Sequence, residues 1–150
     1  VGLFAVNLGG AAIWLVPSAF VGTMIFGGVL GYYGWPLPMV EEGIGISVVA
    51  MGLAIALGVR LSTIAAMALV GIFAVFHGHA HGSEGIGLGI SFLPYAAGFV
   101  CATALLHITG IALGLSLDRL GETPATILKR CAGTAGAIAG VSILAGWLAT

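Results

Sequence analysis

Long runs of hydrophobic residues, broken at short intervals by glycine, proline and a few charged residues, make up almost all of this 150-residue chain. The runs do not alternate strictly between apolar and polar positions, as the strands of a membrane β-barrel would. Several are close to the roughly 20 apolar residues that a helix needs to cross a bilayer. The pattern therefore predicts an all-α fold, a polytopic membrane helix bundle.

Five of the runs have the length of a full membrane span, and the first run is shorter. Because Val1 already lies inside an apolar segment, we expect the printed sequence to begin part way through a first helix. The intact protein would then have six transmembrane helices, and residues 1–150 would form a single transmembrane domain. The expected elements are a half-helix at 1–10 and full spans at 13–30, 41–58, 61–81, 91–117 and 127–148.

The composition supports a membrane environment and excludes several functions. The chain is 60% hydrophobic and 6% charged, whereas soluble domains carry about 25% charged residues. Its net charge of −1 and lack of a basic cluster make nucleic acid an unsuitable partner. The sequence has no GxxxxGK[ST] phosphate loop, so the chain carries no ATP motor of its own.

Glycine is abundant, with 26 residues, and small residues recur four positions apart within the runs. This spacing lets helix backbones approach closely in a bilayer, within one chain or between copies in an oligomer. The pairs are Gly27/Gly31, Gly110/Gly114 and Gly136/Gly140.

The few charges predict the orientation in the membrane. Arg60 follows the second full span, and Arg119, Lys129 and Arg130 follow the fourth, so both loops belong on one side. The positive-inside rule makes that side cytoplasmic. Glu41 and Glu84 then lie on the external side.

The segment from Phe76 to Glu84, FHGHAHGSE, holds three of the four histidines at the end of an apolar run. At about 100° per residue, His77, His81 and Glu84 fall within an arc of about 60°, whereas His79 points the opposite way. Imidazoles four residues apart, with a carboxylate one turn later, suit Ni²⁺, Co²⁺, Zn²⁺ or Cu²⁺. The alternative is that these histidines only cap a helix end near the headgroups.

Other ionisable residues lie in or beside the spans, where such groups usually mark a functional path. Glu41 and Glu42 open a helix; either carboxylate could be favoured there by the helix dipole alone, and one is a candidate ligand. His107 lies near the middle of the fourth full span, with Thr103 one turn outward on the same face. It is either a second metal station or a hydrogen-bonded packing residue. Phe20 on its own indicates only a packed aromatic side chain.

Several segments resemble the HupE/UreJ family of bacterial nickel and cobalt permeases, which are linked to hydrogenase and urease maturation. Phe76–Glu84 resembles the family signature FHGxAHGxE, and the stretch from Leu15 to Phe20 is similar to the segment ahead of its second helix. The remaining similarities are to VExGI, at Val40–Ile44 and followed by Ser47, and to TxLLHxxG, at Thr103–Gly110.

The resemblance implies a six-helix protein of the bacterial inner membrane that admits Ni²⁺ or Co²⁺ as its transported substrate, without an organic cofactor and without enzymatic activity. It implies metal contact by His77, His81, Glu84, Glu41 and His107, and selects Glu41 over Glu42. Phe20, Thr103 and His79 are expected to support the path. The family's HPxxGxDH motif, at the outer end of its first helix, is absent from the printed residues.

Three other readings remain open. An intramembrane zinc-dependent hydrolase would hold zinc with His77, His81 and His107 and use Glu84 or Glu41 as base. A haem-binding membrane anchor would use His81 and His107 as axial ligands. A structural membrane subunit would need only the glycine packing.

Overall fold

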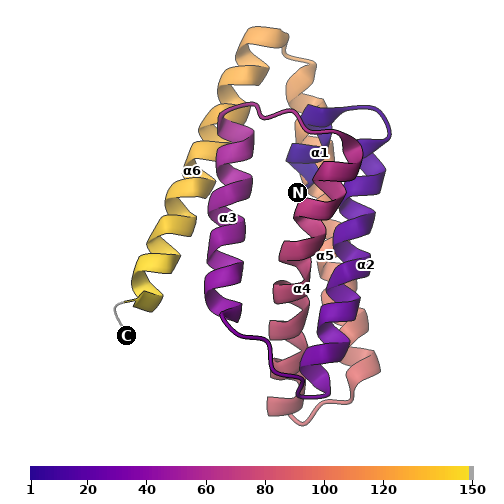
Figure 1. Ribbon diagram of the computed structural model, residues 1–150. Helices are drawn as coiled ribbons and strands as arrows, with labels where there is room; N and C mark the ends of the chain where they lie inside the picture. The colour runs from indigo at the N-terminus through magenta and orange to yellow at the C-terminus, as the bar shows by residue number, and fades with distance from the viewer. Residues whose placement is uncertain (149–150) are drawn as a thin grey trace.

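A computed structural model describes the backbone of residues 1–148 and the side chains of residues 1–146. These residues form six α-helices and no β-strand, as Figure 1 shows. The prediction of an all-α bundle is therefore confirmed. The helices are α1 (Gly2–Leu8), α2 (Ala12–Tyr32), α3 (Val40–Ala56), α4 (Thr63–Gly87), α5 (Phe92–Asp118) and α6 (Glu122–Leu148).

The lengths of these helices are those of a multi-pass membrane protein. Among the described residues, α2, α4, α5 and α6 are long and apolar enough to cross a membrane. Helix α3 has 17 residues, or about 25 Å, at the lower limit of a spanning helix. Four of the five expected full-length spans are thus present, and α3 is shorter than expected. Helix α1 has 7 residues, too few to cross a bilayer.

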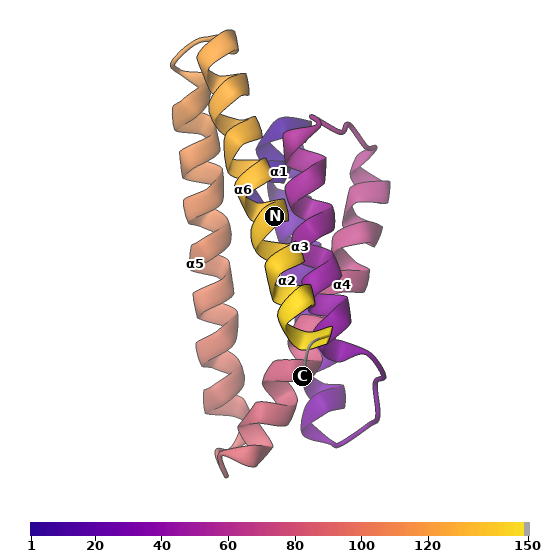
Figure 2. The same ribbon diagram turned by 90° about the vertical axis from the view of Figure 1, so that its left-hand side faces the viewer.

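The connectors lie at two opposite ends of the bundle, and Figures 1 and 2 agree on this arrangement. One end, called here the Arg60 end, holds the connectors α1–α2, α3–α4 and α5–α6. The other, called the Glu84 end, holds the connectors α2–α3 and α4–α5. Helix α3 begins and α4 finishes at this second end, so Glu41 and Glu84 belong to the same end of the molecule.

Glycines bring α2 and α4 into backbone contact. A Cβ atom on Gly27 would overlap the carbonyl oxygen of Val75, and one on Gly31 would overlap that of His79. In return, Gly78 and Gly82 of α4 lie against the carbonyl oxygens of Met24 and Gly28. The close helix contact predicted for Gly27 and Gly31 is therefore confirmed. It also fixes the rotation of α4, and with it the directions of the histidine side chains.

The other two glycine pairs also lie at helix contacts. Gly110 and Gly114 of α5 face α1, where added Cβ atoms would lie 3.2 Å from Leu3 N and 3.0 Å from Val6 Cβ. A Cβ on Gly140 of α6 would lie 2.8 Å from Val49 of α3, whereas Gly136 has ordinary van der Waals room. Helix α6 thus packs along α3, as Figure 2 shows.

Helix α4 continues six residues beyond the predicted end at residue 81. The glycine-rich stretch after His81 lowers helix propensity, which suggested a connector. Packing reverses that preference, because Gly82 lies against the α2 backbone and Gly85 lies beneath the ring of Tyr95. Glu84 is consequently a helical residue, fixed one turn after His81.

The start of α6 differs from the prediction as well. The helix begins at Glu122 rather than near residue 127, so Lys129 and Arg130 lie about two turns into it rather than at its start. Lys129 is 8% exposed, and its Nζ donates a hydrogen bond of 2.6 Å to Asp118 at the end of α5. The ion pair explains how a lysine is kept within an apolar helix contact.

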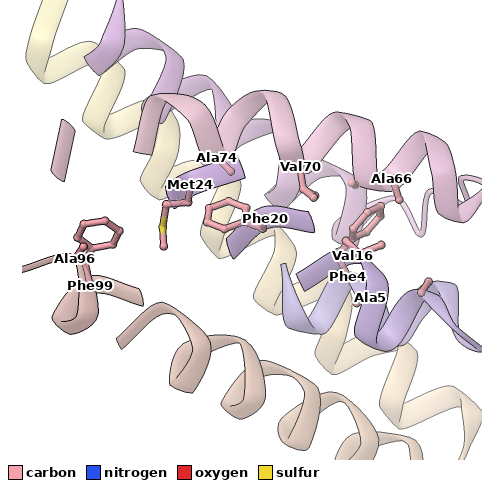
Figure 3. Close-up of a cluster of buried hydrophobic side chains, with 12 residues drawn as sticks. Phe4, Ala5, Val16, Phe20, Met24, Ala66, Val70, Ala74, Ala96 and Phe99 are labelled. Carbon is pink, nitrogen blue, oxygen red and sulfur yellow. The ribbon is translucent and has the colours of Figure 1, made fainter. Parts of the chain in front are cut away.

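The buried core follows the contact between α2 and α4, with α1 and α5 closing it. Figure 3 shows Phe20 near the centre of this row, Met24 and Phe99 on one side, and Val16 and Phe4 on the other. Phe20 is 8% exposed. The aromatic ring that the sequence marks as a packing residue is thus at the centre of the bundle, where the histidines of α4 and α5 approach it.

Candidate metal path

His81 and Glu84 meet at the Glu84 end of the bundle. His81 Nδ1 lies 3.3 Å from Glu84 Oε2, and the hydroxyl group of Tyr95 donates a 3.0 Å hydrogen bond to the same oxygen. The imidazole of His81 stacks on the ring of Phe99, with centroids 5.2 Å apart. The side chains of His81 and Glu84 are 40% and 61% exposed, so an incoming ion can reach both.

His77 lies one turn deeper and has a different set of neighbours. Its Nε2 atom forms a 2.9 Å hydrogen bond with the hydroxyl group of Ser47 on α3. Its ring is tilted against Phe20, with centroids 5.6 Å apart. His77 therefore faces the interior between α2, α3 and α4.

His107, on α5, also contacts the ring of Phe20. The two rings meet edge to face, 5.0 Å apart, and His107 is 8% exposed. Its Nδ1 atom is buried and has no hydrogen-bond partner among the described residues. A buried polar atom without a partner is costly, and one explanation for such an atom is a ligand role. Thr103, one turn away, donates to Met24 Sδ at 3.5 Å.

His79 is directed away from these residues, as its helical position predicts. It is buried, and its Nε2 donates a 2.7 Å hydrogen bond to the carbonyl oxygen of Trp35 in the α2–α3 connector. The bond ties the connector to α4. Nothing in this geometry brings His79 to the other histidines.

Glu41 lies in the first turn of α3 and is exposed. No hydrogen bond or ion pair joins it to His81 or Glu84 within the described part of the chain. It shares with them only the same end of the bundle. Its neighbour Glu42 is half-buried in the same turn.

The candidate residues thus form two groups rather than one. The outer group is His81, Glu84 and Tyr95, and the inner group is His77 and His107 around Phe20, with Ser47 behind His77. Among the described residues, no three histidine, cysteine, aspartate or glutamate side chains are placed to hold one metal ion. Two separate groups, neither with three such ligands, suit passage of an ion better than its retention.

Ser47 and Tyr95 are the contributors that the sequence did not single out as site residues. The sequence marks each of them only as a polar group within an apolar stretch. Ser47 lies within α3, and Tyr95 lies in the first turn of α5. Their partners are 30 and 11 residues away in the sequence, so only the packing of the helices identifies them.

The fold and these groups define a class: a multi-pass helical membrane protein with imidazole groups in its interior and an imidazole–carboxylate pair at one end. The family model described as HupE / UreJ protein matches residues 1–143. Protein HupE of Rhizobium leguminosarum bv. viciae is 47% identical over 146 residues, which cover 97% of this chain and 74% of that relative. The chain belongs to the HupE/UreJ family.

Membership associates the chain with the transport of nickel or cobalt, since this is a family of metal transporters rather than of enzymes. The resemblance noted in the histidine segment is thus confirmed over nearly the whole sequence. No solved structure matches the chain.

Proposed function

We propose that this protein carries Ni²⁺ or Co²⁺ inward across the bacterial cytoplasmic membrane along a path lined by histidine and glutamate. The observation that supports this most strongly is the order of two groups along α4: an exposed His81–Glu84 pair lies at one end, and a half-buried His77 lies one turn deeper. Family membership supplies the class of substrate.

The outer group is suited to the first loss of water from the ion. Burying a doubly charged ion is costly unless ligands replace its hydration shell, and Glu84 offers a carboxylate beside the imidazole of His81. Tyr95 holds the carboxylate through its hydrogen bond, and Phe99 supports the face of the imidazole. Glu41, at the same end, joins the group as a further oxygen ligand.

The inner group continues the path past Phe20. His77 and His107 contact the same aromatic ring from two helices, and the unpartnered Nδ1 of His107 is a free ligand atom at the centre of the bundle. An inside-negative membrane potential contributes about 2.3 kcal/mol per charge per 100 mV, or about 4.6 kcal/mol for a divalent ion. Downhill entry therefore needs no nucleotide.

The test is uptake of radioactive nickel and cobalt by cells that express the protein at equal levels. We expect His81→Ala, Glu84→Gln and Glu41→Gln to lower uptake about tenfold or more. Losing even a residue that only supports a metal ligand typically lowers metal affinity or activity by that factor. Glu42→Gln is the matched control and should keep uptake near wild type. Uptake that is unchanged in both His81→Ala and Glu84→Gln would contradict the proposed path.

A further inference from the structure

Ser47 occupies a position that controls one of the inner histidines. It lies on α3, is 4% exposed, and makes two hydrogen-bonding contacts. Its Oγ is 2.6 Å from the carbonyl oxygen of Ile44, one turn earlier in the same helix, and 2.9 Å from His77 Nε2 on α4.

The number of hydrogens on these atoms fixes the direction of both bonds. A serine hydroxyl group has one hydrogen, and a carbonyl oxygen only accepts. The short contact with Ile44 therefore requires Ser47 to donate to that carbonyl oxygen. With its hydrogen used, Ser47 Oγ accepts from His77, so the hydrogen of the neutral imidazole resides on Nε2.

This assignment leaves the lone pair of His77 on Nδ1. The described residues offer that atom no hydrogen bond. Among the described residues that line a cavity of about 310 Å³, His77 and Ser47 are the two with polar side chains; the others include Phe20, Met51, Val70 and Phe73. No other side chain in that lining carries a hydrogen-bond donor, so the lone pair is available to a cation.

We propose that Ser47 is a positioning residue: it holds His77 as the Nε2–H tautomer, so that Nδ1 is the atom that meets the transported cation. The proposal rests on the proposed function, in which His77 belongs to the path. A metal-binding imidazole usually has its second nitrogen fixed by a hydrogen bond, which sets the tautomer and the ring orientation. Ser47 supplies that bond from a neighbouring helix.

The tautomer is measurable without any transport. Protein labelled with ¹⁵N-histidine and held in nanodiscs gives separate signals for protonated and unprotonated ring nitrogens, and the His77 signals are assigned as those lost in His77→Gln. We expect wild type and Ser47→Thr to show protonated Nε2 and unprotonated Nδ1. In Ser47→Ala the two tautomers should mix while the His79 signals stay in place.

Two results would overturn the assignment: a wild-type His77 protonated on Nδ1, or a His77 tautomer that is the same in Ser47→Ala as in wild type. The first result can be obtained even if Ser47→Ala fails to fold, because it needs only the wild-type protein. Neither of these two results depends on transport. Failure of the tautomer assignment is therefore distinguishable from failure of the proposed path, which would appear as normal uptake in His81→Ala and Glu84→Gln.

The role in transport is tested by the concentration dependence of nickel uptake. We expect Ser47→Ala to raise KM about tenfold to a hundredfold, in line with the loss of an outer partner of a metal ligand. Ser47→Thr should restore KM toward wild type because it retains the hydroxyl group. If Ser47→Ala lowers only the amount of folded protein and leaves KM unchanged, the bond is structural and the positioning role is wrong.

Discussion

Three histidines within five residues of α4 have three different environments. His77 bonds to Ser47 inside the bundle, His79 bonds to the α2–α3 connector, and His81 lies beside Glu84 at the exposed end. Helical geometry turns His79 away from the other two histidines, because each residue is rotated by about 100° from the previous one. His77 and His81 differ because their partners lie on α3 and α5. The role of each histidine is therefore set by its neighbours on other helices.

The separate role of His79 gives a prediction at the scale of one residue. His79→Gln should retain most nickel uptake, because the amide group of glutamine can also donate to the Trp35 carbonyl oxygen. His79→Ala should cost about 1 kcal/mol of stability through loss of that bond. Uptake assays and thermal unfolding of the two purified variants test this. A loss of uptake in His79→Gln as large as that in His81→Ala would place His79 in the path instead.

At this scale, the sequence predicted which way His79 points but not the contacts of His77 and His81. The spacing of His77, His81 and Glu84 suggested one shared group, and it correctly turned His79 away. It did not predict that His77 and His81 would part, because their partners come from α3 and α5. Ser47 and Phe99 are ordinary residues of apolar spans until those helices are packed beside α4.

At the scale of the helices, the contact between α2 and α4 positions the site. Both helices bring glycines to the contact, so each backbone lies against the other's carbonyl oxygens. This was predictable for Gly27 and Gly31 from their spacing. The extension of α4 to Gly87 was not, because glycine propensity argues against a helix and only the packing of Gly82 and Gly85 outweighs it.

Two glycines of α2 test this contact. Gly27→Ala should destabilise the protein by about 1–3 kcal/mol, because its methyl group meets the Val75 carbonyl oxygen of the α4 backbone. Gly22→Ala, on the same helix, has no neighbour within 4 Å and should be neutral or stabilising by up to about 1 kcal/mol. Thermal unfolding of both variants in detergent provides the comparison, and equal effects would argue against the close contact.

For the whole molecule, the number and order of helices followed from the hydrophobic runs. The arrangement in space did not, since the runs alone do not say that α6 packs along α3 and α4 along α2. The orientation in the membrane is a prediction from four basic residues, three of which (Arg60, Lys129 and Arg130) line one polar cavity at the Arg60 end. We predict that this end is cytoplasmic.

The orientation is testable with two matched positions. Leu57 and Leu88 follow α3 and α4 at opposite ends and are 69% and 66% exposed. In a background with Cys101→Ser and Cys131→Ser, a membrane-impermeant maleimide added to cells with a permeabilised outer membrane should label Leu88→Cys and leave Leu57→Cys unlabelled. The opposite pattern would invert the proposed direction of the path.

The central claim is that an imidazole and a carboxylate on α4 receive the ion at the Glu84 end. The most direct measurement is anomalous X-ray scattering at the nickel absorption edge from crystals of the protein grown with Ni²⁺. We predict an anomalous peak in contact with the His81 imidazole and the Glu84 carboxylate. A peak found only elsewhere, or none at saturating nickel, would contradict the claim.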